Sequence, residues 1–256
     1  MFTGGLTYRV DGSRRLLLDV LRPAAAPDPC PLVLFVHGGG WHEGDRGAGM
    51  HPWLNPLLVS HGFVTASVTY RLSDEAHWPV PLHDVRAALR WLRAHAGEYG
   101  ADPYRIGVWG HSAGAHLAAL AALTATGQDR VQAVALSACP ADLRAERLDS
   151  GNEVARLMGP DAGAGALAAA SPICHAHPAA PPVLLAHGTR DEVVSVGQSL
   201  AFRDALGAAG VDVRWAPIEG APHEWGDRPG CTDGSEVAGT FGALALPFFR
   251  EHLDRH

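Results

Sequence analysis

A serine stands between two glycines, each two residues away, in the segment Trp109–His116 (WGHSAGAH). A short apolar run precedes this segment, and an alanine- and leucine-rich run follows it directly. A nucleophilic serine presents its hydroxyl at a sharp strand-to-helix turn, where neighbouring side chains would clash. Gly110 and Gly114 would remove those clashes, so the spacing predicts Ser112 as a nucleophile at the carboxyl end of a central strand. An ordinary strand-to-helix turn is the alternative interpretation.

A glycine run that could bind a developing negative charge lies at His37–Trp41 (HGGGW), directly after another apolar run. Acyl transfer needs backbone N–H donors aimed at the oxyanion. The pattern predicts that the amides of Gly39, Gly40 and Ala113 supply them. A merely flexible glycine loop is the alternative. We expect His37 to brace the loop through hydrogen bonds rather than to transfer protons.

A serine nucleophile also needs a histidine base that a carboxylate orients. Asp191 comes just after the apolar run PVLLAHGT, and His223 just after VDVRWAPI, so the order along the chain is serine, aspartate, histidine. That order is typical of a strand–turn–helix nucleophile. Glu192 is the alternative carboxylate, but Asp191 is nearer the strand. His187 precedes Asp191 at the strand end, and we expect it to be structural.

Two further histidine groups raise the question of a metal site. His111 and His116 are five residues apart and do not share a helical face. His175 and His177 lie beside a proline with no third ligand nearby in the sequence. We therefore expect neither a metal nor a cofactor.

Strand-like and helix-like segments alternate over most of the chain. Between 81 and 99 the apolar residues Val85, Leu89, Leu92 and Ala96 form one helical stripe. After a hairpin from Tyr8 to Val20, the predicted strands cover 32–39, 62–70, 105–110, 131–138, 182–189 and 211–218. The predicted helices cover 81–99, 113–125, 195–209 and 236–253. This alternation predicts an α/β fold with a mostly parallel central sheet and helices on both faces.

We expect a single domain over residues 1–256, because this length fits one large α/β domain and no internal repeat is visible. One stretch, 142–170, breaks the alternation: it is polar, then rich in glycine and alanine, and has no strand pattern. It predicts short helices above the sheet, and at most a small lid.

Composition excludes several classes of partner. The formal net charge is −7 and all 20 basic residues are arginine, with no basic run of the kind that binds nucleic acid. No apolar run approaches the roughly 18 residues of a membrane-spanning helix, and the first residues show no signal-peptide pattern. The cysteines are far apart and form no CxxC, which favours free thiols: Cys30, Cys139, Cys174 and Cys231. We therefore expect a cytoplasmic protein that binds neither nucleic acid nor a membrane; the pattern leaves its oligomeric state open.

Taken together, the motifs resemble the α/β-hydrolase superfamily, and more narrowly the carboxylesterases of the BD-FAE and hormone-sensitive-lipase-like type. The resemblance covers nearly the whole chain and is carried by LLLDVLRP, HGGGWHEGDR, VTYRLS, DPYRIGVWGHSAGAHLA, SPI, PPVLLAHGTRDEVV and APH. It implies a Ser112–Asp191–His223 triad and cofactor-free hydrolysis of carboxylic esters. Some members of this group cleave acetyl or feruloyl groups from plant polymers, and arylformamidases share its HGG-W and GxSAG elements.

The resulting hypothesis is a serine carboxylesterase that acts on small esters with short acyl groups. Trp41, Trp78 and Trp225 are candidates for lining its pocket, with core or rim packing as the alternative for each. Two other functions stay open at this point. One is an amide hydrolase of arylformamidase or peptidase type, and the other is a non-catalytic binding protein on a hydrolase fold.

Overall fold

The computed structural model describes residues 1–25, 29–47, 54–145, 152–224 and 235–254, with the backbone alone for 145 and 235–240. Trp225, Cys231 and residues 146–151 of the predicted lid lie outside the described residues.

One eight-stranded sheet forms the centre of the described chain, in the order β1-β2-β4-β3-β5-β6-β7-β8. The strands are β1 (Phe2–Asp11), β2 (Arg14–Leu21), β3 (Cys30–Val36), β4 (Val64–Val68), β5 (Ala101–His111), β6 (Ala133–Ser137), β7 (Val183–Gly188) and β8 (Val213–Ile218). β1 and β2 form an antiparallel hairpin, β2 pairs antiparallel with β4, and β4 to β8 are parallel in the sheet order. The mostly parallel sheet and its N-terminal hairpin are therefore confirmed.

Seven α-helices and four 3₁₀ turns connect or flank these strands in the described residues. The helices are α1 (Leu54–Ser60), α2 (Val80–His95), α3 (Ala113–Leu123), α4 (Glu153–Met158), α5 (Ala164–Ala169), α6 (Val196–Ala208) and α7 (Ser235–Leu253). The 3₁₀ turns are η1 (Ala96–Tyr99), η2 (Gly127–Asp129), η3 (Leu143–Ala145) and η4 (Pro172–His175). The sequence pattern did not predict α1, which is only two turns long.

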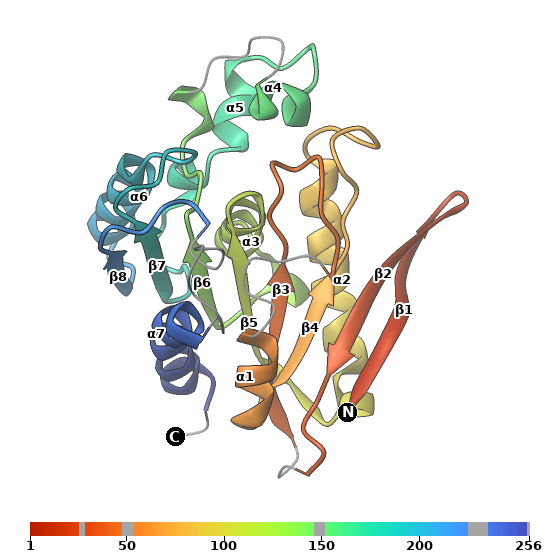
Figure 1. Cartoon of the computed structure of the whole chain (residues 1–256). Helices are drawn as coiled ribbons and strands as arrows, with labels where there is room; N and C mark the ends of the chain where they lie inside the picture. The colour runs from red at the N-terminus through yellow and green to blue at the C-terminus, as the bar shows by residue number, and fades with distance from the viewer. Residues whose placement is uncertain (26–28, 48–53, 146–151, 225–234, 255–256) are drawn as a thin grey trace.

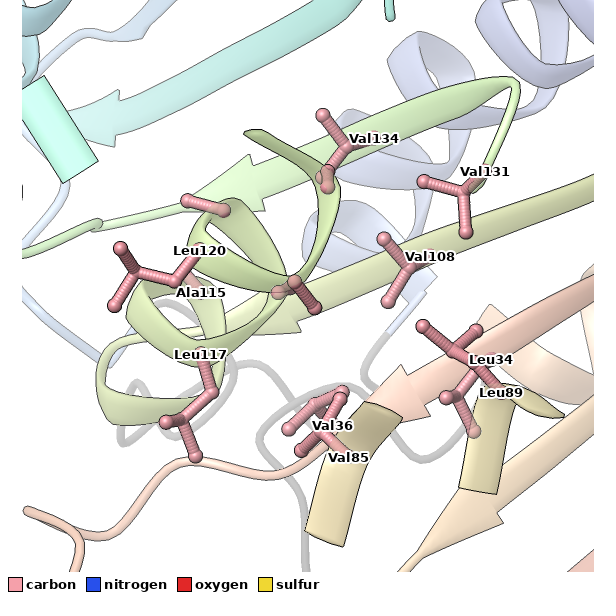
Figure 2. Close-up of a cluster of buried hydrophobic side chains, with 14 of the residues drawn as sticks. Leu34, Val36, Val85, Leu89, Val108, Ala115, Leu117, Leu120, Val131 and Val134 are labelled. Carbon is pink, nitrogen blue, oxygen red and sulfur yellow. The ribbon is translucent and has the colours of Figure 1, made fainter. Parts of the chain in front are cut away.

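Two apolar clusters cover the two faces of the sheet. All seven residues of β3 are buried, and they alternate between the clusters: Leu32, Leu34 and Val36 join one, Val33 and Phe35 the other. The first cluster packs α2, α3 and α6 on one face, and the second packs α1 and α7 on the opposite face (Figure 1). Figure 2 shows part of the first cluster, with Leu34, Val36, Val85, Leu89, Val108, Ala115, Leu117, Leu120, Val131 and Val134 labelled. A parallel sheet buried on both faces explains why its strands are continuous apolar runs.

The segment predicted as a lid holds η3, α4 and α5 above the carboxyl ends of the strands, with no strand among its described residues (Figure 1). Val154, Leu157 and Met158 of α4 are buried and belong to the same cluster as α2 and α3. α4 is therefore packed onto the core beside the sheet, and we call residues 152–170 the cap.

No helix in the described part of the chain combines the length and the apolar character that crossing a membrane requires.

The tightest backbone approach lies where β5 turns into α3. A Cβ added to Gly114 would collide with the carbonyl oxygen of Val36 and lie 2.5 Å from that of His37. A Cβ on Gly110 would lie 2.5 Å from the carbonyl carbon of Gly114. Each clash is with backbone atoms, which cannot rotate away. The two glycines of the GxSxG pattern are thus required by packing.

We predict that Gly114→Ala destabilises the protein by about 3 kcal/mol, because α3 would have to move away from the end of β3. The matched control is Gly207→Ala in α6, where an added Cβ meets nothing within 4 Å. That substitution should leave stability equal or raise it by about 0.5–1 kcal/mol, since alanine favours the helix. Chemical denaturation of both variants checks the pair; equal stabilities would show that the close approach at Gly114 is not a constraint.

Candidate active site

The turn between β5 and α3 holds Ser112 at a positive φ of +52°, with ψ of −122°. A non-glycine residue there costs on the order of 1–3 kcal/mol and persists only where the surroundings impose it. The Ser112 N–H donates to the carbonyl of Ser137 in β6 at 2.9 Å, which fixes the turn from the neighbouring strand. The hydroxyl is thereby presented at the carboxyl edge of the sheet.

The three residues predicted as nucleophile, base and carboxylate form one hydrogen-bonded chain. His223 Nε2 lies 3.1 Å from Ser112 Oγ, and His223 Nδ1 lies 2.7 Å from Asp191 Oδ2. Asp191 follows β7 and His223 follows β8, so the parallel strands bring residues far apart in sequence to one edge. With Nδ1 donating its proton to the carboxylate, Nε2 is left to accept the serine proton.

Asp191 is held as a buried anion. Its side chain has no exposed surface, and its Oδ1 accepts the N–H groups of Val193 at 2.9 Å and Val194 at 2.8 Å. Burial alone would raise the pKa of Asp191, but hydrogen bonds from His187, His223 and the Val194 amide outweigh burial and hold the pKa well below its usual range. Glu192, the alternative carboxylate, is exposed.

His187 supports the Asp191 loop through contacts with Ser199, Val194 and Asp191. Its side chain is fully buried, Ser199 Oγ lies 2.7 Å from Nδ1, and Nε2 lies 2.9 Å from the Val194 carbonyl and 3.1 Å from Asp191 Oδ2. A neutral imidazole satisfies all three contacts if the Ser199 hydroxyl donates to Nδ1 and the Nε2–H faces both oxygens. This is the structural role that its position in the sequence suggested.

The glycine loop after β3 runs beside the serine. A Cβ on Gly38 would lie 3.5 Å from Ser112 Cβ, and Gly39 and Gly40 have φ of +105° and +52°. The Gly39 carbonyl accepts the N–H groups of His42 and Glu43, each at 3.0 Å, which closes the loop into a turn. Side chains at 39 or 40 would therefore be strained, so the loop keeps a bare backbone next to Ser112.

His37 begins this loop as a fixed support. Its ring stacks on Tyr70 with 4.3 Å between centroids, and the Tyr70 hydroxyl donates to the His37 carbonyl at 3.0 Å. Burial lowers the pKa of His37, which keeps the ring neutral.

A buried polar chain ties this loop to α3 and the cap. Trp41 Nε1 donates to His116 Nδ1 at 3.2 Å, and His116 Nε2 donates to the Ala170 carbonyl at 2.7 Å. Burial lowers the pKa of His116 to about 4, so it stays neutral in this arrangement. Sequence reasoning weighed His116 only as a metal ligand; its place four residues after the serine, in a helix of apolar residues, was the available signal.

The three tryptophans predicted to line a pocket have different positions in the structure. Trp41 is buried and lines the cavity beside Ser112. Trp78 does not line that cavity in the described residues; it packs on the core, with its ring 6.1 Å from that of His116. Trp225 lies outside the described residues.

We name the space beside the serine the Ser112 cavity; its volume is about 320 Å³. Its described lining is Trp41, Ser112, Pro140, Leu143, Asn152, Glu153, Val154, Val193, Val194, Ser195 and Gln198. Sequence reasoning missed the lining residues that come from the cap segment. Asn152 is the N-cap residue of α4, because its side chain accepts the N–H groups of Val154 and Ala155. A polar N-cap residue before an apolar stripe was the signal for that helix start.

No three histidine, cysteine, aspartate or glutamate side chains come together as a metal site within the described ranges. His111 Nδ1 lies 3.0 Å from Ser137 Oγ, and His175 and His177 each contact a backbone carbonyl.

The chain is similar in sequence to a known protein family and to named esterases. The family model BD-FAE matches residues 18–206. Esterase LipQ of Mycobacterium tuberculosis is 34% identical over 83% of the chain, and Esterase LipC of the same organism is 34% identical over 93%. The chain spans 55% of LipQ and 63% of LipC.

Among solved structures, the apo form of Thermogutta terrifontis esterase 2 superposes with a TM-score of 0.82 at 26% identity. The superposition covers 98% of this chain and 96% of that one. The sheet order, the turn at Ser112 and the extent of the family match lead to one conclusion: the chain belongs to the BD-FAE family and has the α/β-hydrolase fold.

Proposed function

We propose that this protein is a serine carboxylesterase. The observation that carries the proposal is the chain Ser112 Oγ–His223 Nε2 and His223 Nδ1–Asp191 Oδ2, at 3.1 and 2.7 Å. These distances are within the range in which a base takes a proton from a nucleophile.

In the proposed reaction Ser112 Oγ attacks the ester carbonyl while His223 takes the hydroxyl proton. His223 then gives that proton to the leaving alcohol oxygen, and Asp191 stabilises the imidazolium in between. Water, activated by the same imidazole, attacks the acyl-enzyme and releases the acid. The buried anion at Asp191 fits this role, because its hydrogen bonds keep it ionised.

The oxyanion donors in this proposal are the amides of Gly39, Gly40 and Ala113. The support is the bare loop that runs beside Ser112 and the start of α3 directly after it. Donors of this kind are effective because they are fixed before charge develops.

The compared proteins support ester chemistry. LipQ and LipC are named esterases, and Thermogutta terrifontis esterase 2 has been solved phosphonylated by sarin. Other structures of that esterase hold butyrate or propionate. For this chain we propose short acyl groups, since the cap packs onto the core and leaves a Ser112 cavity of about 320 Å³.

Hydrolysis of p-nitrophenyl acetate tests the proposal directly. Turnover that follows enzyme concentration supports it, whereas binding without turnover points to a binding protein. A faster reaction on N-formylkynurenine than on any ester would assign the site to amide hydrolysis.

We predict that Ser112→Ala lowers kcat by about 10⁶-fold, because the nucleophile is lost. The melting temperature of the variant should not fall, because the substitution removes only the hydroxyl and breaks no backbone contact. The control is Ser195→Ala, a second serine of the cavity lining, which should keep most of its turnover. Retention of a tenth of the activity by Ser112→Ala would exclude it as nucleophile.

We predict that Asp191→Asn lowers kcat by about 10⁴-fold, because an amide at this position favours the wrong imidazole tautomer. Glu192→Gln is the matched control: it removes the adjacent carboxylate, which is exposed, and should change kcat little. Steady-state kinetics of the two variants side by side decide the assignment. The reverse order of effects would move the orienting role to Glu192.

We predict that kcat/KM for p-nitrophenyl esters is highest between acetate and butyrate and falls by about ten-fold or more at octanoate. A pocket discriminates one methylene by roughly 1–3 kcal/mol, and α4 of the cap, whose residues line the cavity, bounds the space that a longer chain would have to enter. A series from acetate to palmitate measures this. Highest activity on the longest chains, with activation at an interface, is the contrary result.

A further inference from the structure

The two sides of the proposed reaction have different surroundings. The Ser112 cavity touches the serine but not His223 in the described residues. A second hollow, of about 480 Å³, touches His223 and not Ser112, and its lining includes Arg190, Glu192 and Glu224. The leaving alcohol oxygen must face His223 Nε2 to receive its proton. The Ser112 cavity is the described hollow that reaches the nucleophile, and we assign the acyl group of the proposed reaction to it.

One carboxylate faces this acyl side. Among the described lining residues of the Ser112 cavity, Glu153 is the single acid or base. Its carboxylate lies against the oxyanion loop: a Cβ on Gly40 would be 2.6 Å from Oε2. Asn152 is the N-cap of α4 and fixes the start of that helix, and Glu153 is the first residue of the helix. A group attached to a carbonyl held by that loop would lie close to this carboxylate.

Among the described residues, the oxygens of Glu153 have one weak ionic partner. In the described part of the chain its one basic neighbour within 4 Å is His42, with Nε2 3.5 Å from Oε1. The neighbouring amide of Gln198 is engaged: Oε1 accepts the N–H groups of Ala141 and Asp142, and Nε2 donates to the Asp142 carbonyl. Glu153 is half exposed, so an acyl group entering the cavity takes water from it.

The consequence depends on what the acyl group carries. A plain alkyl chain desolvates the carboxylate and offers no hydrogen bond in place of the lost water. A hydroxyl or ammonium group restores a hydrogen bond, and one to a charged acceptor is stronger than one between neutral groups. A second carboxylate adds repulsion between like charges. We propose that Glu153 is a specificity residue that selects short acyl groups bearing a hydrogen-bond donor, above all hydroxyacyl esters, and rejects carboxylated ones. This inference rests on the proposed esterase function.

Three ethyl esters with four-carbon acyl groups test the proposal: ethyl butyrate, ethyl 3-hydroxybutyrate and monoethyl succinate. Their kcat/KM values are measured by pH-stat titration for the wild-type protein, Glu153→Gln and Glu43→Gln. Glu43 is the matched control. It is an exposed carboxylate at the end of the glycine loop, and it does not line the Ser112 cavity in the described residues.

We expect the wild-type protein to prefer the hydroxybutyrate over the butyrate by about ten-fold, the order of one charge-assisted hydrogen bond. It should also prefer the butyrate over the succinate by about ten-fold, because the two carboxylates repel each other. Glu153→Gln should bring both ratios close to one, whereas Glu43→Gln should keep the wild-type ratios. Added salt should weaken rejection of the succinate, because it screens a partly exposed charge.

The outcomes separate this inference from the function on which it rests. If the wild-type protein hydrolyses none of the three esters, the esterase proposal fails. If it hydrolyses ethyl butyrate but shows no preference among the three, the assignment of Glu153 is overturned without any variant. Wild-type preferences that persist in Glu153→Gln overturn it as well.

Discussion

Contact between the backbones of α3 and β3 is the constraint on which the site depends. With no side chain at Gly114, the first turn of α3 rests on the carbonyls of Val36 and His37. That contact forces the chain to turn within one residue, which puts Ser112 at φ +52°. It also brings the glycine loop that begins at His37 beside the serine. A helix even slightly farther from β3 would separate the nucleophile from the loop proposed to bind the oxyanion.

Buried histidines hold the loops around this turn. His116 joins the Trp41 ring of the glycine loop to the Ala170 carbonyl at the end of the cap, and His187 joins α6 to the Asp191 loop. In each case both ring nitrogens are within hydrogen-bond distance of a partner, so a single imidazole links two separate segments. Buried polar groups satisfied in this way fix one arrangement, because any slip would leave a donor or acceptor unpaired.

Local spacing was sufficient to predict the turn at Ser112, the glycine loop and the alternation of strands and helices, because each leaves a short pattern in the sequence: glycines where backbones approach closely, and apolar runs where strands are buried. The hydrogen-bonded chain to Asp191 and His223 was predictable because the ends of parallel strands meet at one edge. Glu153 was not, since its place beside Gly40 depends on how the cap folds back, which no periodicity encodes. The short helix α1 was missed for a related reason: two turns are too few to show a helical stripe.

Glu153 also bears on the electrostatics of the proposed reaction. Its carboxylate lies against Gly40, whose amide is one of the proposed oxyanion donors. A negative charge there opposes the negative charge that develops on the carbonyl oxygen, and the opposition grows as water leaves the cavity. A donor on the acyl group would partly offset the carboxylate's field at the moment when the oxyanion forms. Selection by Glu153 would then act on the transition state more than on the bound substrate, and so on kcat more than on KM.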